Sequence, residues 1–359
     1  NYVIIYTLFK NKFINIYNNI FFMEKLPLSE KYRPKILDEI IGNKDEIFFF
    51  KKYIETNYLP NIIINGFPGT GKTSCALAFI NEYFKTTSNK NKDFLELNAS
   101  DDRGIDIVRS KIKVFAKKKN NIKTDNKSNY YSIILLDEAD NMTQSAQYAL
   151  RRTIDKYNYK TRFILTCNNI ENIIDNIQSM CTIFEFGNIL TKDIFNKLQT
   201  ICIKENINIK DEAIYALISL HENKNDIRGM INMIELIKGN FFNNSANKPI
   251  EKKNIYEICD KPSPEYIYSI FENIENNKLI DAINISYNLK SIGFTNLDIC
   301  STLYNEILNY KFKEDNENIK LKCYDCTGDY NIIYINGNDS DLQLASLIIK
   351  LSKIINKYS

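Results

Sequence analysis

The segment NIIINGFPGTGKTSCALAFI, from Asn61 to Ile80, decides the fold of this chain. An apolar or near-apolar run at 62–65 leads into a glycine-rich loop at 66–73, and a second apolar run begins at Cys75. This order predicts a buried strand, a loop and a helix, which is the context that a P-loop requires. The glycines let consecutive backbone N–H groups point at phosphate oxygens, and the helix dipole adds to the attraction. The segment therefore predicts a site for a nucleoside triphosphate.

Two side chains at the end of this loop have predicted roles. We expect Lys72 to reach the β- and γ-phosphates and Thr73 to ligate magnesium. A decayed loop that binds nothing is the alternative, and the strand and helix on either side disfavour it. The nucleotide-binding residues predicted from the loop are Gly66, Phe67, Pro68, Gly69, Thr70, Gly71, Lys72, Thr73 and Ser74.

A second apolar run ends in two carboxylates. Residues 131–136 read as a strand that is covered on both faces, as a parallel sheet requires, and Asp137 and Glu138 follow at once. We expect Asp137 to hold magnesium through water and Glu138 to polarise the attacking water. A pair of surface carboxylates is the alternative, but the strand aims both residues at the P-loop.

The composition bounds the class of protein. A chain of 359 residues is long enough for two or three domains. Its net charge of +3 means that any contact with nucleic acid must come from a local patch. The eight cysteines are scattered through apolar stretches, which is typical of reduced, buried residues of an intracellular protein. Cys323 and Cys326 form a lone CxxC, a weak zinc signal. The single histidine, His221, ends a helical stretch and is expected at the surface or in a lid.

The order of patterns along the chain predicts its organisation. Strand and helix patterns alternate over 36–187, which is typical of a doubly wound α/β domain. From Thr191 onward the pattern is helical, with a break at Pro262 and Pro264. The other predicted strands are 94–98, 131–136, 162–166 and 183–186, the predicted helical units are 192–238 and 263–358, and the predicted flexible loops are 85–92 and 117–129.

The first 22 residues form a separate feature. Asn and Lys residues interrupt their apolar run, so it is a poor membrane span and the chain is expected to have no membrane association. The segment also lacks the basic leader and the cleavage site of a signal peptide. We expect residues 1–22 to be an extension without a structural role.

Two other P-loop classes are rivals. The letters Asp-Glu-Ala-Asp at 137–140 are those of a helicase class, but such helicases carry a second ATPase-like domain, whereas the distal part here is helical. P-loop kinases lack the acidic pair and the distal helical units. Both classes are disfavoured.

Further motifs, in this order, resemble those of a known family. They closely resemble the small subunits of replication factor C, the eukaryotic sliding-clamp loader of the AAA+ class, over about residues 28 to 265, and they are most similar to the subunit often numbered two. The motifs are SEKYRPK at 29–35, LDEIIG at 37–42, LNASDDRGID at 97–106, ALRRTI at 149–154, TCNN at 166–169 and NDIRG at 225–229.

The resemblance implies an architecture and a function. It implies an α/β AAA+ P-loop core at 23–187, with a parallel sheet flanked by helices, an all-α lid at 188–260 and an all-α collar at 261–359. The chain would be an ATPase subunit of a nuclear heteropentamer that uses ATP and Mg²⁺ to load a ring-shaped clamp onto primer-template DNA in replication and repair. A scaffold subunit with slow turnover, and an AAA+ remodeller acting on proteins, remain as alternatives.

The resemblance also assigns roles to single residues. Arg33 and Ile41 would lie near the adenine and ribose. Asn168, at the tip of its strand, would position water beside the γ-phosphate and so join Lys72, Asp137 and Glu138 as a catalytic residue. Arg228, at the start of a lid helix, would reach over the nucleotide. A surface ion pair with Asp226 is the alternative for Arg228, and such pairs contribute little.

One motif departs from the family. Where the family has Ser-Arg-Cys, with an arginine that completes the neighbouring subunit's ATP site, this chain has Ser179, Met180 and Cys181. Methionine offers no charge to a phosphoryl transition state, so we expect the adjoining site not to be fully activated. Arg151 or Arg152 is a partial substitute, or the facing site needs no hydrolysis.

A basic helix face is the candidate for DNA. After Gly104, helical spacing places Ile105, Val108, Ile112 and Phe115 on one face and Arg109, Lys113 and Lys117 on the adjoining one. The resemblance implies that helices here follow duplex phosphates, a contact that is blind to sequence. The predicted DNA-binding residues are Arg103, Arg109 and Lys113. An ordinary solvated basic face is the alternative.

Overall fold

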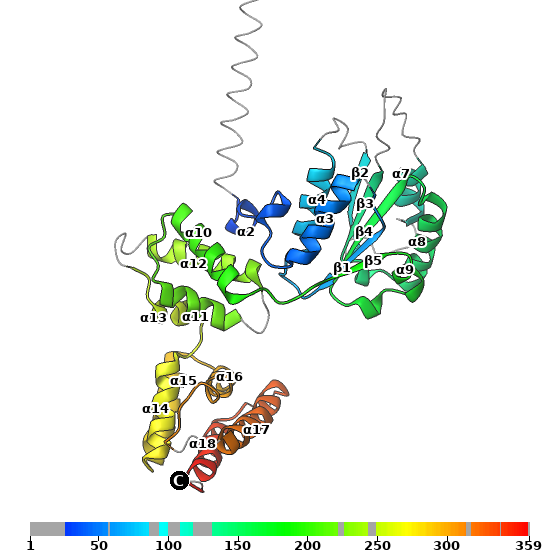
Figure 1. The fold of residues 1–359 in the computed structure, drawn as a ribbon. Helices are drawn as coiled ribbons and strands as arrows, with labels where there is room; N and C mark the ends of the chain where they lie inside the picture. The colour runs from blue at the N-terminus through cyan, green and yellow to red at the C-terminus, as the bar shows by residue number, and fades with distance from the viewer. Residues whose placement is uncertain are drawn as a thin grey trace, which may run out of the picture. The chain divides into compact units, whose positions relative to one another are not determined.

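Figure 1 shows the computed structural model of the chain. It describes residues 26–56, 58–85, 93–99, 108–117, 131–221, 226–242, 249–313, 317–337 and 339–357, with the backbone alone at 108, 109, 240–242 and 357. The predicted extension 1–22 and most of the predicted loops 85–92 and 117–129 lie outside these residues. The chain divides into two compact units, 1–207 with 217–238, and 208–216 with 239–359.

A parallel sheet forms the centre of the first unit. Within the described residues it has five strands in the order β2-β3-β4-β1-β5, and every neighbouring pair is parallel. The predicted α/β core is thus confirmed, and each predicted strand is present within one residue of its expected bounds. The strands are β1 (Ile62–Gly66), β2 (Phe94–Asn98), β3 (Ser132–Asp137), β4 (Thr161–Cys167) and β5 (Thr182–Phe186).

Helices cover both faces of this sheet (Figure 1). Successive strand residues point to opposite faces, so Ile62 and Ile64 of β1 join a core that includes Phe50 and Phe79, while Ile63 joins the other core. All five side chains are completely buried. A strand buried on both faces must be apolar at every position, which is why β1 and β3 were recognisable as continuous apolar runs.

Side-chain caps mark some helix ends in the core domain. For example, the Thr143 hydroxyl caps α8 by accepting the backbone N–H of Ala146. The helical elements here are α2 (Leu28–Lys31), η1 (Leu37–Glu39), α3 (Lys44–Thr56), α4 (Lys72–Tyr83), η2 (Val108–Ile112), α7 (Lys113–Lys117), η3 (Ala139–Asn141), α8 (Gln144–Tyr157), η4 (Ile170–Asn172) and α9 (Asp175–Gln178).

The segment proposed to face DNA is not a regular α-helix. η2 is a π-helix, and α7 continues from it. The regular helical spacing that the pattern assumed is therefore interrupted, because a π turn has wider spacing than an α turn. The side chain of Arg109 lies outside the described residues, so its alignment with Lys113 stays a prediction. Further along, Ile112 is buried and Phe115 packs against the same core, while Lys113 and Lys117 are exposed, as the pattern predicted.

The chain from Thr191 is helical, as predicted. Its first helices are α10 (Thr191–Lys204), α11 (Asp211–His221), α12 (Ile227–Phe242) and α13 (Lys252–Ile258). His221 ends α11, and its Nδ1 lies 3.0 Å from the Leu217 carbonyl oxygen. The ring is thus engaged with its own helix.

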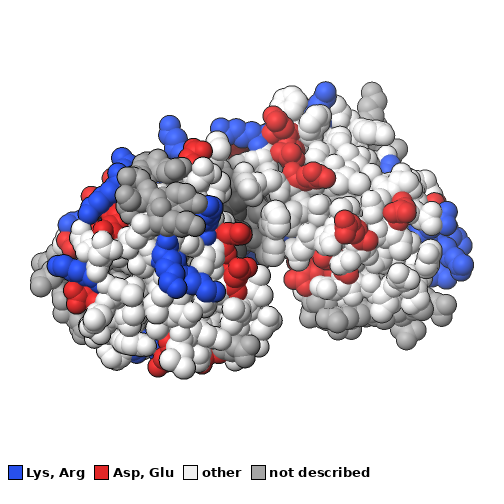
Figure 2. Space-filling model, turned by 90° about the horizontal axis from the view of Figure 1, so that it is seen from below, with Lys and Arg blue, Asp and Glu red and all other residues white. Residues whose placement is uncertain are grey.

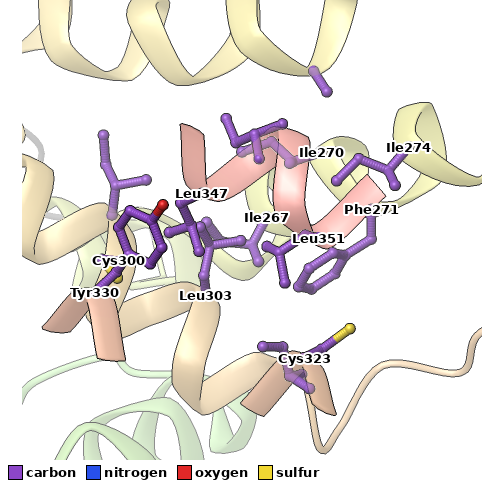
Figure 3. Packing of buried hydrophobic residues seen from close by; sticks show 14 of the residues in the cluster. Ile267, Ile270, Phe271, Ile274, Cys300, Leu303, Cys323, Tyr330, Leu347 and Leu351 are labelled. Carbon is purple, nitrogen blue, oxygen red and sulfur yellow. The ribbon is translucent and has the colours of Figure 1, made fainter. Parts of the chain in front are cut away.

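The distal helices of the second unit enclose a core of their own. Figure 3 shows Phe271, Leu303, Leu347 and Leu351 converging in it. Cys323 is buried in this cluster and Cys326 packs at its edge, which fits cysteines acting as small apolar residues. The helices are α14 (Pro264–Glu275), α15 (Leu279–Ile292), α16 (Asn296–Glu306), α17 (Glu317–Ile335) and α18 (Asp341–Lys357).

None of the helices in the described ranges combines the length and hydrophobicity that a membrane span needs. The three-domain division at 187 and 260 stays a prediction.

Candidate functional site

A pocket lies at the carboxyl ends of the central strands, where open parallel sheets place their ligands. Its empty space is about 1090 Å³, open solvent at its mouth included. It is lined by Ser29, Glu30, Tyr32, Arg33, Pro34, Ile40, Ile41, Pro68, Gly69, Thr70, Gly71, Lys72, Thr73, Ser74, Asp137, Glu138, Thr166, Cys167, Asn168, Ile189, Lys197, Ile227, Arg228 and Ile231.

The P-loop turns on glycines at the rim of this pocket. Gly69 and Gly71 have φ values of +81° and +89°, a region that other residues rarely adopt. A Cβ at Gly69 would lie 2.2 Å from a carboxylate oxygen of Asp226, so this position also lacks space for a side chain. α4 begins directly afterwards at Lys72, which leaves the N–H groups of its first turn facing the pocket.

The Lys72 ammonium is held by three acceptors. Its Nζ donates to the carbonyl oxygens of Gly66 and Phe67, both at 2.8 Å, and to Oδ1 of Asn168 at 2.9 Å. The residue is only 8% exposed. Burial lowers the pKa of Lys72, against the opposing effect of Cys167, Asp137 and the neighbouring carboxylates. These three contacts hold the Lys72 amine at the end of β1, between the P-loop and Asn168.

The Asp137 carboxylate receives two hydroxyl groups. Oγ1 of Thr73 donates to Oδ1 of Asp137 at 2.8 Å, and the buried Thr166 hydroxyl donates to the same oxygen. Thr166 in turn accepts the backbone N–H of Glu138 at 3.1 Å. A carboxylate beside a hydroxyl is an oxygen donor set of the kind that Mg²⁺ prefers. The residues present therefore fit a magnesium ion.

Glu138 has an unusual backbone conformation. Its φ is 53°, in the left-handed region, where a residue other than glycine is uncommon. Its Oε2 accepts from Nδ2 of Asn141 at 3.2 Å. Such outliers persist where the surroundings impose them, and they cluster at functional sites. This one lies directly after the strand-end carboxylate.

Asp140 fixes the loop after β4. Its Oδ2 accepts the backbone N–H groups of Asn168 and Asn169, at 3.0 Å and 3.3 Å. The Asn168 side chain is thereby brought to Lys72, at the pocket and at the end of the strand next to β3. Asp140, the last letter of the Asp-Glu-Ala-Asp motif, thus orients a neighbouring strand end.

The remaining predicted residues form the other walls. Arg33 and Ile41 line the pocket beside Pro34 and Ile40, and Nε of Arg33 is buried without a hydrogen-bond partner among the described residues. Nη1 of Arg33 pairs with Glu30 at 3.3 Å. The exposed Arg228 lines the pocket from the first turn of α12.

Asp226, the ion-pair partner considered for Arg228, bonds the backbone of the same helix. Oδ1 of Asp226 accepts the backbone N–H of Gly229 at 3.1 Å, so this carboxylate caps the helix from which the arginine projects.

Several lining residues were missed from the sequence, and three of them carry polar side chains of interest here: Thr166, Tyr32 and Lys197. Thr166 lies within the quoted TCNN motif, and the parallel pairing of β3 and β4 was the signal for its proximity to Asp137. Tyr32 lies within the quoted SEKYRPK motif. Lys197 projects from α10, and burial lowers its pKa, against the opposing charge of Glu39. A single lysine in a lysine-rich helix carries no such signal.

Comparison with known proteins adds the family. The model of the ATPase family associated with various cellular activities (AAA) matches residues 62–188. Replication factor C subunit 2 of Arabidopsis thaliana is 36% identical over 326 residues, covering 91% of this chain and 93% of that protein. The replication factor C small subunit of Methanococcus vannielii is 34% identical, covering 90% of this chain and 98% of the relative. The chain belongs to the replication factor C small-subunit family.

The fold has solved relatives of lower identity. RuvB of Thermotoga maritima, a Holliday junction branch migration motor, superposes with a TM-score of 0.51 at 15% identity, over 68% of this chain and 79% of RuvB. At that identity the likeness concerns the fold alone.

Met180, the residue that the resemblance predicts at the finger position, lies within the described residues. Met180 is half-buried and packs against the second core of the sheet. The Gln178 amide before it donates to the carbonyl oxygens of Ile170 and Ile173, at 3.1 Å and 2.6 Å. Arg151 and Arg152, the suggested substitutes, are exposed on α8, and Arg151 pairs with Asp155 at 3.8 Å.

The predicted DNA-binding residues are only partly described. Arg103 lies outside the described residues, as does the side chain of Arg109, while Lys113 is exposed on α7. The face drawn in Figure 2 intersperses basic and acidic side chains with uncharged surface. This fits a net charge of +3.

Proposed function

We propose that this chain is an ATP-hydrolysing subunit of a sliding-clamp loader. Together with other replication factor C subunits it would open a ring-shaped clamp and load it onto primer-template DNA in replication and repair. The proposal rests on the family and on one observation. The hydrogen bonds from Lys72 to Asn168 and from Thr73 to Asp137 gather a cation, an amide, a hydroxyl and a carboxylate at one end of the sheet.

Each residue has a role that suits its position. Lys72 and the N–H groups of the P-loop bind the triphosphate, and Glu138 orients and polarises the attacking water. Asn168 positions that water from the adjoining strand. Arg228 reaches the phosphates from the lid side, while Arg33 and Ile41 hold the base and ribose.

Magnesium is the cofactor that the donor set fits. Thr73 and Asp137 would hold it, Asp137 through water, and the ion would neutralise charge on the phosphates. The Thr166 hydroxyl keeps the Asp137 carboxylate oriented, which is the usual function of a hydrogen bond behind a metal ligand.

Assembly and location are part of the same proposal. We place the chain in a nuclear heteropentamer whose collar is formed by the helices from residue 261, with the lid at 188–260 and the AAA+ core at 23–187. DNA contact would come from Arg103, Arg109 and Lys113. A scaffold role with slow turnover stays open, because Met180 removes a charge from the neighbouring site.

Reconstitution tests this function. The chain is assembled with its sibling subunits, and ATP turnover is measured with and without the ring clamp and primed DNA. We expect turnover to rise with both ligands and to fall when Glu138→Gln is introduced, while that variant still binds ATP. As a matched control, Glu212→Gln changes a carboxylate on α11 that does not line the pocket and is expected to behave as the native chain.

Two outcomes would contradict the proposal. Turnover by the isolated chain that is indifferent to clamp and DNA would exclude a loader subunit. Equal turnover with and without Glu138→Gln, together with intact clamp loading, would favour the scaffold role.

A further inference from the structure

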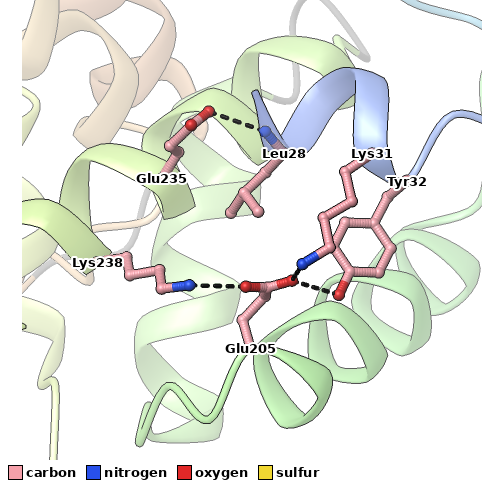
Figure 4. Close-up of polar contacts among 6 residues, drawn as sticks. All are labelled: Leu28, Lys31, Tyr32, Glu205, Glu235 and Lys238. Atoms are coloured by element: carbon pink, nitrogen blue, oxygen red, sulfur yellow. Dashed lines mark hydrogen bonds and ion pairs between the residues drawn. The ribbon is translucent and has the colours of Figure 1, made fainter. Parts of the chain in front are cut away.

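The short helix α2 is bound to the lid helices at two points (Figure 4). The backbone N–H of Leu28 donates to Oε2 of Glu235 at 3.0 Å, and the Leu28 side chain is buried. At the other end of α2, Lys31 and Tyr32 both reach Oε1 of Glu205 at 2.6 Å. A four-residue helix has no stability of its own, so these contacts set its position.

Glu205 is the centre of the second contact. It follows α10 directly, and its side chain is only 5% exposed. Its other oxygen, Oε2, accepts from Lys238 Nζ at 2.7 Å, and Lys238 belongs to α12. Three donors therefore meet on one buried carboxylate. Two of them, Lys31 and Tyr32, come from the N-terminal segment, and Lys238 comes from α12. Loss of this buried carboxylate is costly, because Lys31 and Lys238 are left without a counter-charge and the Tyr32 hydroxyl without its acceptor.

The segments joined by Glu205 are two walls of the nucleotide pocket. Tyr32 lines the pocket while its hydroxyl bonds Glu205, and Arg33 and Pro34 follow it in the chain. α12 contributes Arg228 and other residues of its first turns to the facing wall. Glu205 itself does not line the pocket. Among the described residues, its side chain bonds Lys31, Tyr32 and Lys238, none of which belongs to the P-loop or the strand-end carboxylate.

We propose that Glu205 is a positioning residue that fastens the N-terminal wall of the nucleotide pocket to the lid, so that the nucleoside part of the ligand meets one preformed surface. The proposal rests on the proposed function, since it assigns the base and ribose to Arg33 and Ile41. The triphosphate would be bound by the P-loop, which connects β1 to α4 and makes none of the hydrogen bonds of Glu205.

This division gives the role a specific signature. Without Glu205 the N-terminal segment and the lid can move independently. Part of the binding free energy of the nucleotide is then used to order them, which weakens binding. The loss affects ligands that must span both walls. ATP is such a ligand, with Arg33 and Ile41 on one wall and Arg228 on the other, whereas inorganic tripolyphosphate has no base or ribose and reaches only the P-loop and Arg228.

The experiment compares these two ligands in the full chain. Affinities for Mg-ATP and Mg-tripolyphosphate are measured by competition against a fluorescent ATP analogue, for the native chain, for Glu205→Gln and for Glu251→Gln. Glu251 is a matched control, since it pairs with Lys210 at 2.6 Å on an exposed surface and does not line the pocket. We expect Glu205→Gln to weaken ATP about tenfold, the size of a moderate coupling between sites, with tripolyphosphate unchanged. Glu251→Gln is expected to match the native chain.

A double-mutant cycle with Arg33→Ala adds a second readout. If Glu205 acts by positioning Arg33 and its neighbours, the two substitutions together weaken ATP by less than the product of their separate effects. If Glu205→Gln fails to fold, Lys31→Gln replaces it, because that side chain is 28% exposed and its loss leaves Lys238 on the carboxylate.

The outcomes separate this inference from the proposed function. A native chain that binds ATP no better than a Lys72→Ala variant would remove the proposed function itself. A native chain that binds ATP through Lys72, with Glu205→Gln equally tight, would overturn the positioning role alone. Equal losses for ATP and tripolyphosphate would also overturn it, because they would reveal a general loss of structure.

Discussion

We expect the Glu205 carboxylate to make the free energy of unfolding fall at low pH, and we expect Glu205→Gln to remove this part of the pH dependence. Burial by itself raises the pKa of Glu205, but hydrogen bonds from Lys238, Lys31 and Tyr32 outweigh it and lower the pKa to about 2. The ordinary value is 4.5. A group whose pKa is lower in the folded state stabilises the fold above its unfolded pKa, and this contribution is lost as the pH falls toward the folded pKa.

The size of the effect follows from the shift. A difference between 4.5 and about 2 corresponds to roughly 3 kcal/mol at about 1.36 kcal/mol per pKa unit. Because the side chain is 5% exposed, solvent screening reduces this figure little. Glu205→Gln keeps the shape of the side chain and removes its charge. The native chain should therefore exceed the variant in stability by a constant amount above about pH 5, and the difference should shrink steadily below that pH.

Urea unfolding followed by far-UV circular dichroism measures this difference at pH 7, 5, 4 and 3. The chain contains no Trp, so tryptophan fluorescence is not an alternative probe. Asp341→Asn is the control, since that exposed carboxylate of the second unit pairs with Lys290 and its removal should change stability little. A native-to-variant difference that stays the same from pH 7 to pH 3 would refute the electrostatic reasoning, and so would a variant that is more stable than the native chain at pH 7.

Three further variants test the site and its surroundings. Thr166→Val removes a hydroxyl bonded to the strand-end carboxylate and should lower ATP turnover by about tenfold to a hundredfold with little change in ATP affinity, which steady-state kinetics and titration would show; an unchanged turnover would contradict the orienting role. Met180→Arg in the assembled complex should raise turnover, since an arginine finger contributes about 10³–10⁵ in rate; no change would count against the missing-finger hypothesis. Arg103→Glu with Arg109→Glu should weaken binding to primed DNA and flatten its salt dependence while ATP binding persists; an unchanged salt slope would favour the solvated-face alternative.

The sequence predicted the parts of the site that depend on local order. A P-loop is contiguous in the chain, so its residues reveal it wherever a strand precedes and a helix follows. The strand-end position of Asp137 was equally readable, because a strand buried on both faces is apolar throughout and its end is marked by the first charge. These features predicted the α/β core, the strand bounds and the residues that gather around Lys72.

Contacts between distant segments were not readable in the same way. Glu205 and Lys31 are separated by 173 intervening residues, and nothing in either local pattern marks one as the partner of the other. The π turn at Val108–Ile112 was missed because hydrophobic periodicity assumes a constant angle per residue. The roles of Asp140 and Thr166 depend on which strands are neighbours, and the order β2-β3-β4-β1-β5 differs from the order in the chain.

Met180 lies outside this chain's own nucleotide pocket, so its effects on this site and on a neighbouring site can be distinguished. The methionine packs against the core on the face of the sheet that carries α8 and α9, and its carbonyl oxygen accepts from Nδ2 of Asn61 at 3.4 Å, directly before β1. Methionine suits this half-buried position because its flexible thioether adapts to the surrounding side chains. It does not line the pocket that holds Lys72 and Asp137. Binding of ATP by this chain should therefore be independent of residue 180, whereas turnover at a neighbouring subunit should respond to it, and the two properties can be measured separately in one variant.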